Sequence, residues 1–286
     1  METKNSVEHP SSNSPKPLLL DQYPKKNFWD FSDIFQSQGF WYTNPHLEAA
    51  RDILAHFEAH NDDNMAQSPL FFDHPWSENV DVKVDEEEEE EEDDPLVKNT
   101  PSSCVQTIEN QVYMTNPTPD LSGMPSPRLF HTHFPYSALP DSIKNSKCKI
   151  VYVTRNPKDT MVSMWHFFNS VRTPEQGPYP FDKAFESFCD GLYPFRPFFN
   201  HVLEYSEASL KKSDKILFWL HFSEGHLLKN LEVNKNGSTA VGLPTNSFYR
   251  LGVVGDWKNN FSPEMEERLD QISSMKLEKT GLDLNK

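Results

Sequence analysis

The amino-acid sequence predicts an α/β fold, a single domain with a mostly parallel central sheet flanked by helices. Residues 150–153 form an unbroken apolar run, and residues 215–222 are apolar through their middle; apolar runs of this length are typical of parallel strands that are covered on both faces. Stretches with apolar residues at helical spacing alternate with these runs, which favours a parallel sheet. The 286 residues are enough for one large domain with a sizeable core.

The segment around residues 150–168 predicts a strand, a turn and a helix. The strand ends on Arg155, and Asn156-Pro157 favours a turn because proline fixes φ and moves the preceding residue out of the helical region. We expect Asp159 to cap the helix that follows. Ligands in open α/β sheets bind at the carboxyl ends of strands. Arg155, with the hydroxyl of Ser163 eight residues later, is therefore predicted to hold a phosphate group.

The first part of the chain divides into three predicted segments. Residues 1–24 are polar and rich in Pro and Ser, so we expect a disordered N-terminal arm before a domain at 25–286. Residues 26–42 are dense in aromatic side chains, which favours a place in the core over a wall around an apolar ligand. A helix is expected from Asn44-Pro45, with asparagine as its cap. A flexible acidic segment is predicted to interrupt the domain around 60–120.

The second part of the chain carries clearer periodicity. A short strand is expected at Leu129 and Phe130 before the polar Thr132 and His133. Residues 232–247 are expected to form a polar loop. Further helices are predicted over three stripes: Phe181, Ala184, Phe185 and Phe188; Phe198, Val202 and Tyr205; and Met265, Leu269, Ile272 and Met275, the last capped by Ser262.

Composition excludes several classes of function. The net charge is −16, of which residues 85–94 supply ten negative charges, so the chain lacks the basic footprint of a nucleic-acid-binding protein. No apolar run approaches membrane-spanning length. Three cysteines without metal-site spacing indicate reduced thiols, and we expect a cytoplasmic protein without a metal. The sequence leaves open whether the chain forms a homodimer.

His133 is the first candidate for catalysis. A histidine at a strand end can act as a general base because its pKa lies near neutral pH, whereas a lone histidine is more often structural. His131 precedes it by two residues and receives no role.

No glycine occurs between Gly39 and Gly123, so no phosphate-binding loop of the GxxxxGK[ST] kind can be written there, which disfavours a P-loop kinase.

The motifs Leu-Phe-His-Thr-His-Phe-Pro-Tyr at 129–136 and Lys-Ile-Val-Tyr-Val-Thr-Arg-Asn-Pro-Lys-Asp at 149–159 resemble the plant cytosolic sulfotransferases, including the flavonol and brassinosteroid enzymes. Both motifs occur in the order and spacing of that family. The resemblance extends to residues 29–42, to the helical stretch after residue 180 and to the chain from Asn230 to the C-terminus, and it covers about three quarters of the chain. It implies a sulfotransferase fold that is related to the P-loop proteins and incomplete here.

The resemblance also implies a reaction and a set of site residues. The reaction is transfer of a sulfonate group from 3′-phosphoadenylyl sulfate (PAPS) to a hydroxyl of a small molecule, such as a flavonoid or a steroid. His133 would be the base, and the aromatics near 35–42 would form part of the acceptor pocket. The residues that would hold the 3′-phosphate are Arg155, Ser163, Arg250, Leu251 and Gly252.

The chain departs from the family pattern at three places. The loop Pro-Lys-Ser-Gly-Thr-Thr-Trp, expected after the helix at 45–59, is absent, and a gap or an unpaired edge in the sheet is expected in consequence. Where the family has the motif Lys-Tyr-Glu, this chain has Leu220-His221-Phe222. Where the family has Arg-Lys-Gly, this chain has Arg250-Leu251-Gly252. The alternative function is therefore a catalytically impaired paralogue that retains nucleotide binding or acts only through interactions.

Overall fold

The computed structural model describes residues 18–68, 104–220, 232–238, 244–248, 253–278 and 280–284. The acidic run at 85–94 and the predicted site residues Arg250, Leu251 and Gly252 lie outside these ranges. The predicted arm at 1–24 overlaps them only from Leu18 on. There a short 3-10 helix, η1 (Leu20–Gln22), forms, and Leu18, Leu20 and Tyr23 pack against the core. The chain is therefore anchored to the domain earlier than residue 25.

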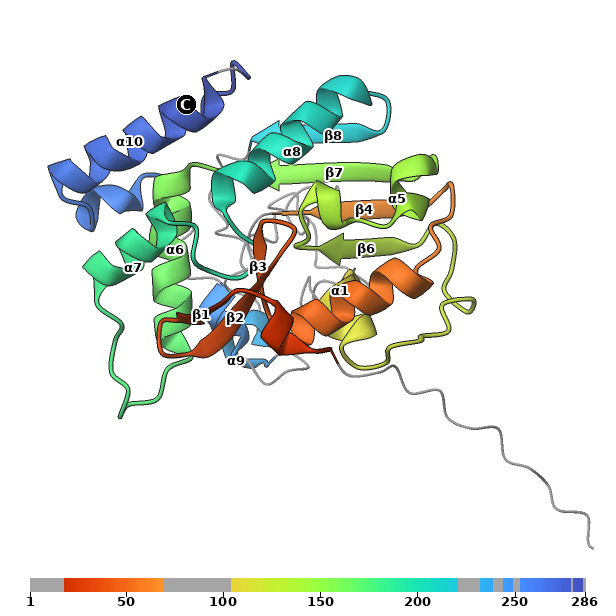
Figure 1. Cartoon of the computed structure of the whole chain (residues 1–286), viewed down its shortest axis with the longest axis horizontal. Coiled ribbons are helices and arrows are strands. Elements are labelled where there is room, and N and C mark those ends of the chain that lie inside the picture. Colours follow the sequence, from red (N-terminus) through yellow and green to blue (C-terminus); the bar gives the residue numbers. More distant parts are fainter. Residues whose placement is uncertain are drawn as a thin grey trace, which may run out of the picture.

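A five-stranded parallel sheet forms the centre of the molecule, as the sequence predicts. Its strands lie in the order β5-β6-β4-β7-β8, and every neighbouring pair is parallel. Figure 1 shows the longer strands side by side, with α6 near the ends toward which the arrows of β6 and β7 point. The bounds are β4 (Asn64–Gln67), β5 (Gln106–Thr107), β6 (Leu129–Thr132), β7 (Lys149–Thr154) and β8 (Ile216–Leu220).

Strand β4 corrects the prediction of a gap in the sheet, and at 64–67 it also corrects the prediction of a flexible segment around 60–120, of which residues 69–103 lie outside the described ranges. It pairs with β6 on one side and β7 on the other, and Met65 lies opposite both Phe130 and Ile150. Met65 is 2% exposed, so the strand is part of the core. A four-residue strand with Asn64 and Gln67 at its ends has too little apolar periodicity to be detected from sequence. Pairing on both sides stabilises it nonetheless.

A second, antiparallel sheet precedes β4, in a region where the sequence predicts no strands. It comprises β1 (Lys25–Phe28), β2 (Ser32–Ser37) and β3 (Phe40–Thr43). Between β2 and β3, Gln38 and Gly39 have φ of 52° and 85°, as the two central residues of a type I′ hairpin turn require. Most aromatic side chains of this region are buried in the core, which confirms the core interpretation of residues 26–42.

The predicted helices are present. They are α1 (Asn44–His56), α6 (Pro157–Ser170), α7 (Phe181–Cys189), α8 (Phe198–Lys211) and α10 (Pro263–Leu277). Ser262 caps α10 by accepting a hydrogen bond from the Met265 amide, as predicted. The cap of α1 is Thr43 rather than Asn44, one residue earlier than expected. No helix of the described ranges is long and apolar enough to cross a membrane.

Short helices fill segments that the sequence predicts as loops. The polar stretch at 232–247 contains α9 (Glu232–Asn236) and the start of η5 (Thr245–Phe248). A π-helix, η2 (Ile108–Tyr113), directly follows β5 inside the segment that is predicted to be flexible. The remaining short helices of the described ranges are η3 (Tyr136–Ala138), α5 (Asp141–Asn145) and η6 (Asp256–Asn259).

Candidate active site

The carboxyl ends of adjacent strands bring two predicted site residues to one edge of the sheet. His133 directly follows β6, Arg155 directly follows β7, and β4 lies between these strands. Because neighbouring strands are about 4.8 Å apart, the two strand ends are separated by about 10 Å. A substrate that reaches both residues therefore lies across the end of β4, next to Ser68.

His133 is held by a buried carboxylate. Its Nδ1 lies 2.5 Å from Oε1 of Glu109, and the same oxygen accepts a 2.8 Å hydrogen bond from the His133 amide. The second oxygen, Oε2, accepts a 2.9 Å bond from the hydroxyl of Thr132. Glu109 is fully buried and His133 is 2% exposed. One carboxylate thus fixes both the backbone and the imidazole ring at the end of β6.

The position of Glu109 follows from β5 and η2. Thr107 of β5 lies opposite His131 of β6, and Glu109 comes two residues later, in the first turn of the π-helix. π-helical turns are rare and occur frequently at functional sites. Burial raises the pKa of the Glu109 carboxyl to about 7, although the hydrogen bonds from His133 and Thr132 favour its charged form. The carboxyl group therefore titrates close to neutral pH.

Buried polar side chains of other elements hold the backbone next to the His133 ring. Nε2 of His201 lies 3.0 Å from the His133 carbonyl, and the Tyr152 hydroxyl lies 3.1 Å from the other ring nitrogen. Burial lowers the pKa of His201 well below its ordinary value, so this ring is neutral and donates from Nε2. Gln67 and Tyr205 both donate to the Phe134 carbonyl, at 2.6 and 3.0 Å. These contacts connect β4, β7 and α8 to the end of β6.

Aromatic rings surround the imidazole of His133. The ring of Phe195 stacks on it with centroids 5.4 Å apart, and Tyr42 of β3 contacts Phe195 edge-on at 5.7 Å. Phe195 has a φ of 63°, a strained conformation for a residue with a bulky side chain. Its backbone amide donates to the Trp41 carbonyl at 2.6 Å, which joins this segment to β3. The second sheet therefore contributes to the apolar surroundings of His133.

His131, for which the sequence predicts no role, lies beside His133. The two rings meet edge to face, with centroids 4.5 Å apart. Nδ1 of His131 lies 3.4 Å from the Thr107 hydroxyl, and Nε2 lies 3.4 Å from the Ser68 hydroxyl. These distances are long for hydrogen bonds. His131 is 1% exposed and links β5 to the end of β4.

At the end of β7, Asp159 has a different role from the predicted one. The cap of α6 is Asn156, whose side chain accepts from the Lys158 amide at 2.8 Å. The Asp159 carboxylate instead accepts from the amides of Gly255 and Trp257, at 2.9 and 3.2 Å. A carboxylate in the first turn of a helix also matches the helix dipole. Asp159 therefore anchors the segment directly after residues 250–252 beside the start of α6.

A second contact holds this segment in place. The ammonium group of Lys158 lies 4.2 Å from the ring centre of Trp257 and 2.8 Å from Oδ2 of Asp270 in α10. Lys158 is 4% exposed, so both interactions occur mostly out of water. Gly255 has a φ of 86°, which favours glycine at the start of η6. The start of α6, η6 and α10 are thus packed as one unit.

Of the remaining predicted residues, Arg155 and Ser163 lie in described positions. Nη2 of Arg155 donates to the Asp159 carbonyl at 3.1 Å, and its side chain is half-buried. Ser163 lies two turns into α6 and is also half-buried. Arg250, Leu251 and Gly252 lie outside the described residues, and the chain is described again from Val253. The structure therefore brings His133, Arg155 and the anchor of the 250–252 segment to one edge.

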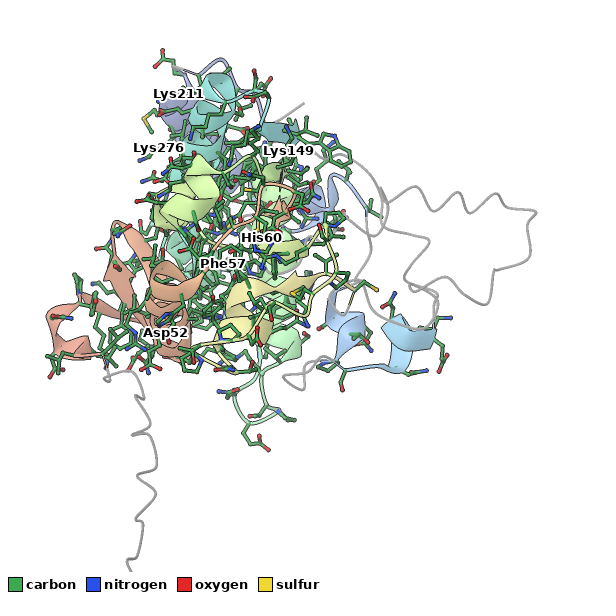
Figure 2. All side chains as sticks on the ribbon, turned by 90° about the vertical axis from the view of Figure 1, so that its right-hand side faces the viewer. Asp52, Phe57, His60, Lys149, Lys211 and Lys276 are labelled. Atoms are coloured by element: carbon green, nitrogen blue, oxygen red, sulfur yellow. The ribbon has the colours of Figure 1, made fainter. Side chains whose placement is uncertain are left out.

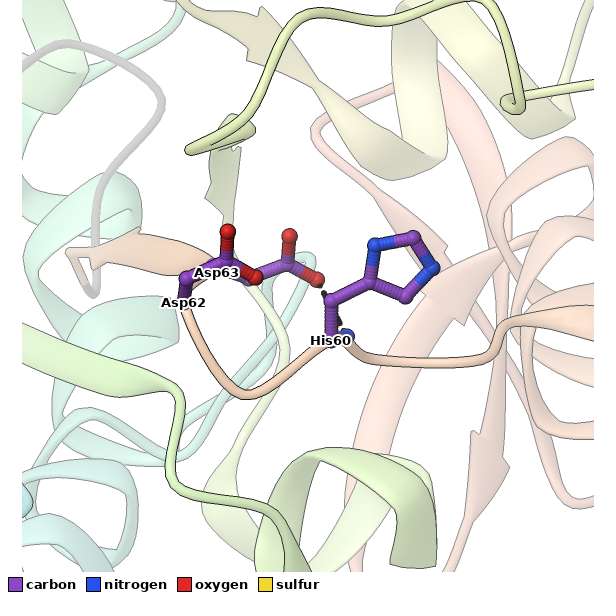
Figure 3. A group of neighbouring side chains, drawn as sticks. All are labelled: His60, Asp62 and Asp63. Atoms are coloured by element: carbon purple, nitrogen blue, oxygen red, sulfur yellow. Dashed lines mark hydrogen bonds between the residues drawn. The ribbon is translucent and has the colours of Figure 1, made fainter.

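The opposite edge of the sheet carries a different polar cluster, formed by His60, Asp62 and Asp63 (Figure 3). Figure 2 shows His60 and Lys149 near the amino ends of β4 and β7. Asp63 accepts from the Arg128 guanidinium, with Nε to Oδ1 at 2.8 Å, and from the His60 amide at 2.7 Å. The Asp62 carboxylate accepts from the Ser126 hydroxyl. These contacts fasten the start of β4 to the chain before β6, so the cluster has a structural role.

Sequence reasoning misses one residue of the site, Glu109, and assigns another, Asp159, a different role. Glu109 falls in the segment that is predicted to be flexible, although Ile108, Val112 and Tyr113 indicate a short helical stripe around it. Asp159 is recognised, but its position in the first turn of a helix predicts a cap. A residue that anchors a segment nearly one hundred positions away leaves no local pattern. Only the fold reveals its partner.

A model of the sulfotransferase domain matches residues 76–224 and 221–281. Cytosolic sulfotransferase 12 of Arabidopsis thaliana is 32% identical over 301 residues, which cover 92% of this chain and 92% of that relative. The chain therefore belongs to the sulfotransferase family, and the resemblance to the plant cytosolic sulfotransferases is confirmed.

Solved structures confirm the fold. A putative steroid sulphotransferase of Arabidopsis thaliana has a TM-score of 0.67 and 31% sequence identity, with 93% of each chain covered. A mouse sulfotransferase complexed with PAP has a TM-score of 0.60 and 21% identity, and covers 86% of this chain and 95% of its own. The second likeness concerns the fold alone.

Proposed function

We propose that this chain transfers a sulfonate group from 3′-phosphoadenylyl sulfate to a hydroxyl group of a small molecule. The observation that carries the proposal is the placement of a buried, carboxylate-linked histidine and an arginine at the same edge of a parallel sheet. His133 follows β6 and Arg155 follows β7. The family membership of the chain supports this donor.

Each predicted site residue receives a defined task in this proposal. Arg155 binds the 3′-phosphate of the donor through its guanidinium, a group that suits phosphate geometry. Ser163 adds a hydroxyl from α6, and Arg250, with the backbone at Leu251 and Gly252, closes the phosphate site. Because leucine replaces the lysine of the family pattern at 251, one charge-assisted contact is lost. We therefore expect weaker donor binding than in relatives that have that lysine.

His133 serves as the general base. Its Nε2 takes the proton of the acceptor hydroxyl while the acceptor oxygen bonds to sulfur and the bond from sulfur to the bridging phosphate oxygen breaks. The aromatic surroundings formed by Phe195 and Tyr42 fit a flat, apolar acceptor, so we propose a flavonoid, a steroid or a similar compound. We place the reaction in the cytoplasm, since the curated relative is named cytosolic.

Turnover of the purified full chain with PAPS and a panel of flavonoid and steroid acceptors tests the proposal. His133→Ala is expected to lower turnover about 100-fold or more, because a general base contributes roughly 10²–10⁴ in rate. His60→Ala is the matched control, since His60 is exposed and belongs to the cluster at the opposite edge. Absence of turnover in the folded wild-type chain would instead favour the catalytically impaired paralogue.

A further inference from the structure

We infer that Glu109 is a positioning residue for His133, holding the proton of the neutral imidazole on Nδ1 and balancing the positive charge that forms when Nε2 takes the acceptor proton. This inference deepens the proposed function and rests on it. No motif of the sequence assigns a role to Glu109. The two residues together are called the Glu109–His133 pair.

The geometry of the pair favours one tautomer. The carboxylate oxygen that lies 2.5 Å from Nδ1 of His133 also accepts from the His133 amide at 2.8 Å. An oxygen already facing one N–H donor is placed to accept a second donor, so a proton on Nδ1 satisfies both contacts. The other oxygen is occupied by the Thr132 hydroxyl at 2.9 Å. With the proton on Nδ1, the basic lone pair of the ring is on Nε2.

A base at this position requires a neighbouring negative charge. His133 is 2% exposed, so water contributes little to the solvation of an imidazolium ion. Glu109 lies at hydrogen-bond distance from the ring, and its charge stabilises the imidazolium more strongly in a buried site than it would in water. This arrangement is the same physical device as a carboxylate behind a catalytic histidine in hydrolases.

The other titratable groups around the pair do not supply this charge. His131 faces the ring of His133 edge-on, and His201 contacts the His133 carbonyl. His46 of α1 acts electrostatically on the Glu109 carboxyl, and the Glu109 carboxyl acts electrostatically on Tyr42 of β3. Burial lowers the pKa of His46 and His201 and raises that of Tyr42, so these groups are neutral near pH 7. Arg196 lies near His201 and adds a positive charge.

The titration of Glu109 supports the same role. Burial raises the pKa of its carboxyl to about 7, so the fraction of ionised Glu109 rises as pH increases through neutrality. Catalysis by the pair requires an ionised carboxylate together with a neutral imidazole. After sulfonate transfer, the proton on Nε2 leaves to solvent with the products, and the pair returns to its starting state.

Nitrogen-15 NMR of the ligand-free full chain tests the inference without any dependence on turnover. The chain has 11 histidines, and the His133 signals are assigned by their loss in His133→Gln. We expect the neutral His133 ring of the wild type to carry its proton on Nδ1. A proton on Nε2 in the folded wild type would overturn the inference, whatever the sulfonation assay shows.

The variant Glu109→Gln keeps the size of the side chain and removes its charge. We expect the NMR titration midpoint of His133 to fall by about 1 unit or more, because a nearby opposite charge shifts a pKa by roughly 1–3 units. Glu207→Gln, at an exposed position of α8, is the matched control and should leave the midpoint unchanged. An unchanged midpoint in folded Glu109→Gln would contradict the inference. Glu109→Asp, which keeps the charge, serves if Glu109→Gln does not fold.

Kinetics separate positioning from a purely structural role. In Glu109→Gln we expect kcat to fall about 100-fold with little change in KM, since the base is weakened and binding is retained. The acidic limb of the pH–rate profile should move to lower pH, and Glu109→Asp should recover part of the rate. Equal losses in Glu109→Gln and Glu109→Asp with an unmoved pH profile would overturn the inference. Absence of turnover in the wild type would overturn the proposed function alone, and the NMR tautomer would still decide this inference.

Discussion

At the scale of single residues, the carboxyl edge of the sheet is organised by two carboxylates that serve other groups. Glu109 receives three hydrogen bonds from the end of β6, and Asp159 receives two from the segment after residue 252. Neither residue needs to touch a substrate to matter. Each holds a chain segment that carries a predicted site residue, because charge-assisted hydrogen bonds are stronger than neutral ones.

The first prediction concerns Asp159. Asp159→Asn removes the negative charge and should weaken both amide contacts, so we expect a loss of about 1–3 kcal/mol in the free energy of unfolding. The KM for PAPS should rise while kcat changes less, since the affected segment borders Arg250. Urea denaturation and steady-state kinetics measure the two effects. An Asp182→Asn variant, in the first turn of α7, is the control. A stable variant with unaltered donor KM would show that this anchor is unimportant.

At the scale of elements, the sequence predicts those that have strong local periodicity. Strand β7, helix α6 and the Ser262 cap of α10 each have an apolar run, a stripe or a capping residue that acts within a few positions. Strands β4 and β5 have none of these signals, because they are short and gain their stability from pairing with β6. The motif residues His133 and Arg155 can be found from sequence because they follow elements with clear patterns.

The second prediction tests the burial of β4. Met65→Ala should lower the free energy of unfolding by about 2–5 kcal/mol, because a cavity remains where the side chain contacted the core. Met114→Ala is the control, since Met114 is 39% exposed. Chemical denaturation of both variants gives the comparison. Similar small losses at the two positions would indicate that β4 is not the central strand.

The third prediction concerns the turn before η6. Gly255 has a φ of 86° and no heavy atom within 4 Å of the place where a Cβ would lie. Gly255→Ala should therefore cost about 1 kcal/mol through backbone strain alone. Gly123→Ala has equal space without a positive φ and should be neutral or slightly stabilising. Thermal unfolding compares the two variants, and equal midpoints would contradict the turn geometry.

At the scale of the whole molecule, the strand order determines which residues form the site. β4 lies between β6 and β7, so a donor held by Arg155, as proposed, would cross the end of β4 to reach His133. The α/β class can be predicted from the sequence, but the strand order cannot, because it depends on a central strand without a pattern of its own. The position of Glu109 depends on the same order, since β5 pairs only with β6 within the described sheet.

The fourth prediction is the pH dependence of stability. The pKa of Glu109 is raised from 4.5 to about 7 in the folded chain, so its contribution to stability is fully present below pH 4.5 and is lost as pH rises toward 7. The free energy of unfolding of the wild type, relative to Glu109→Gln, should therefore fall between pH 5 and pH 8. Urea denaturation at several pH values measures it. A difference that grows with pH would contradict burial of this carboxyl.

The nucleotide site proposed at the carboxyl edge of β7 is tested most directly by calorimetric titration of the purified chain with 3′-phosphoadenosine 5′-phosphate. We expect micromolar binding that is lost in Arg155→Ala. Arg268→Ala is the matched control, since Arg268 pairs with Glu186 on the partly exposed surface of α10, and it should bind as the wild type does. No heat from a folded wild-type sample, or equal binding by Arg155→Ala, would contradict a nucleotide site at this edge.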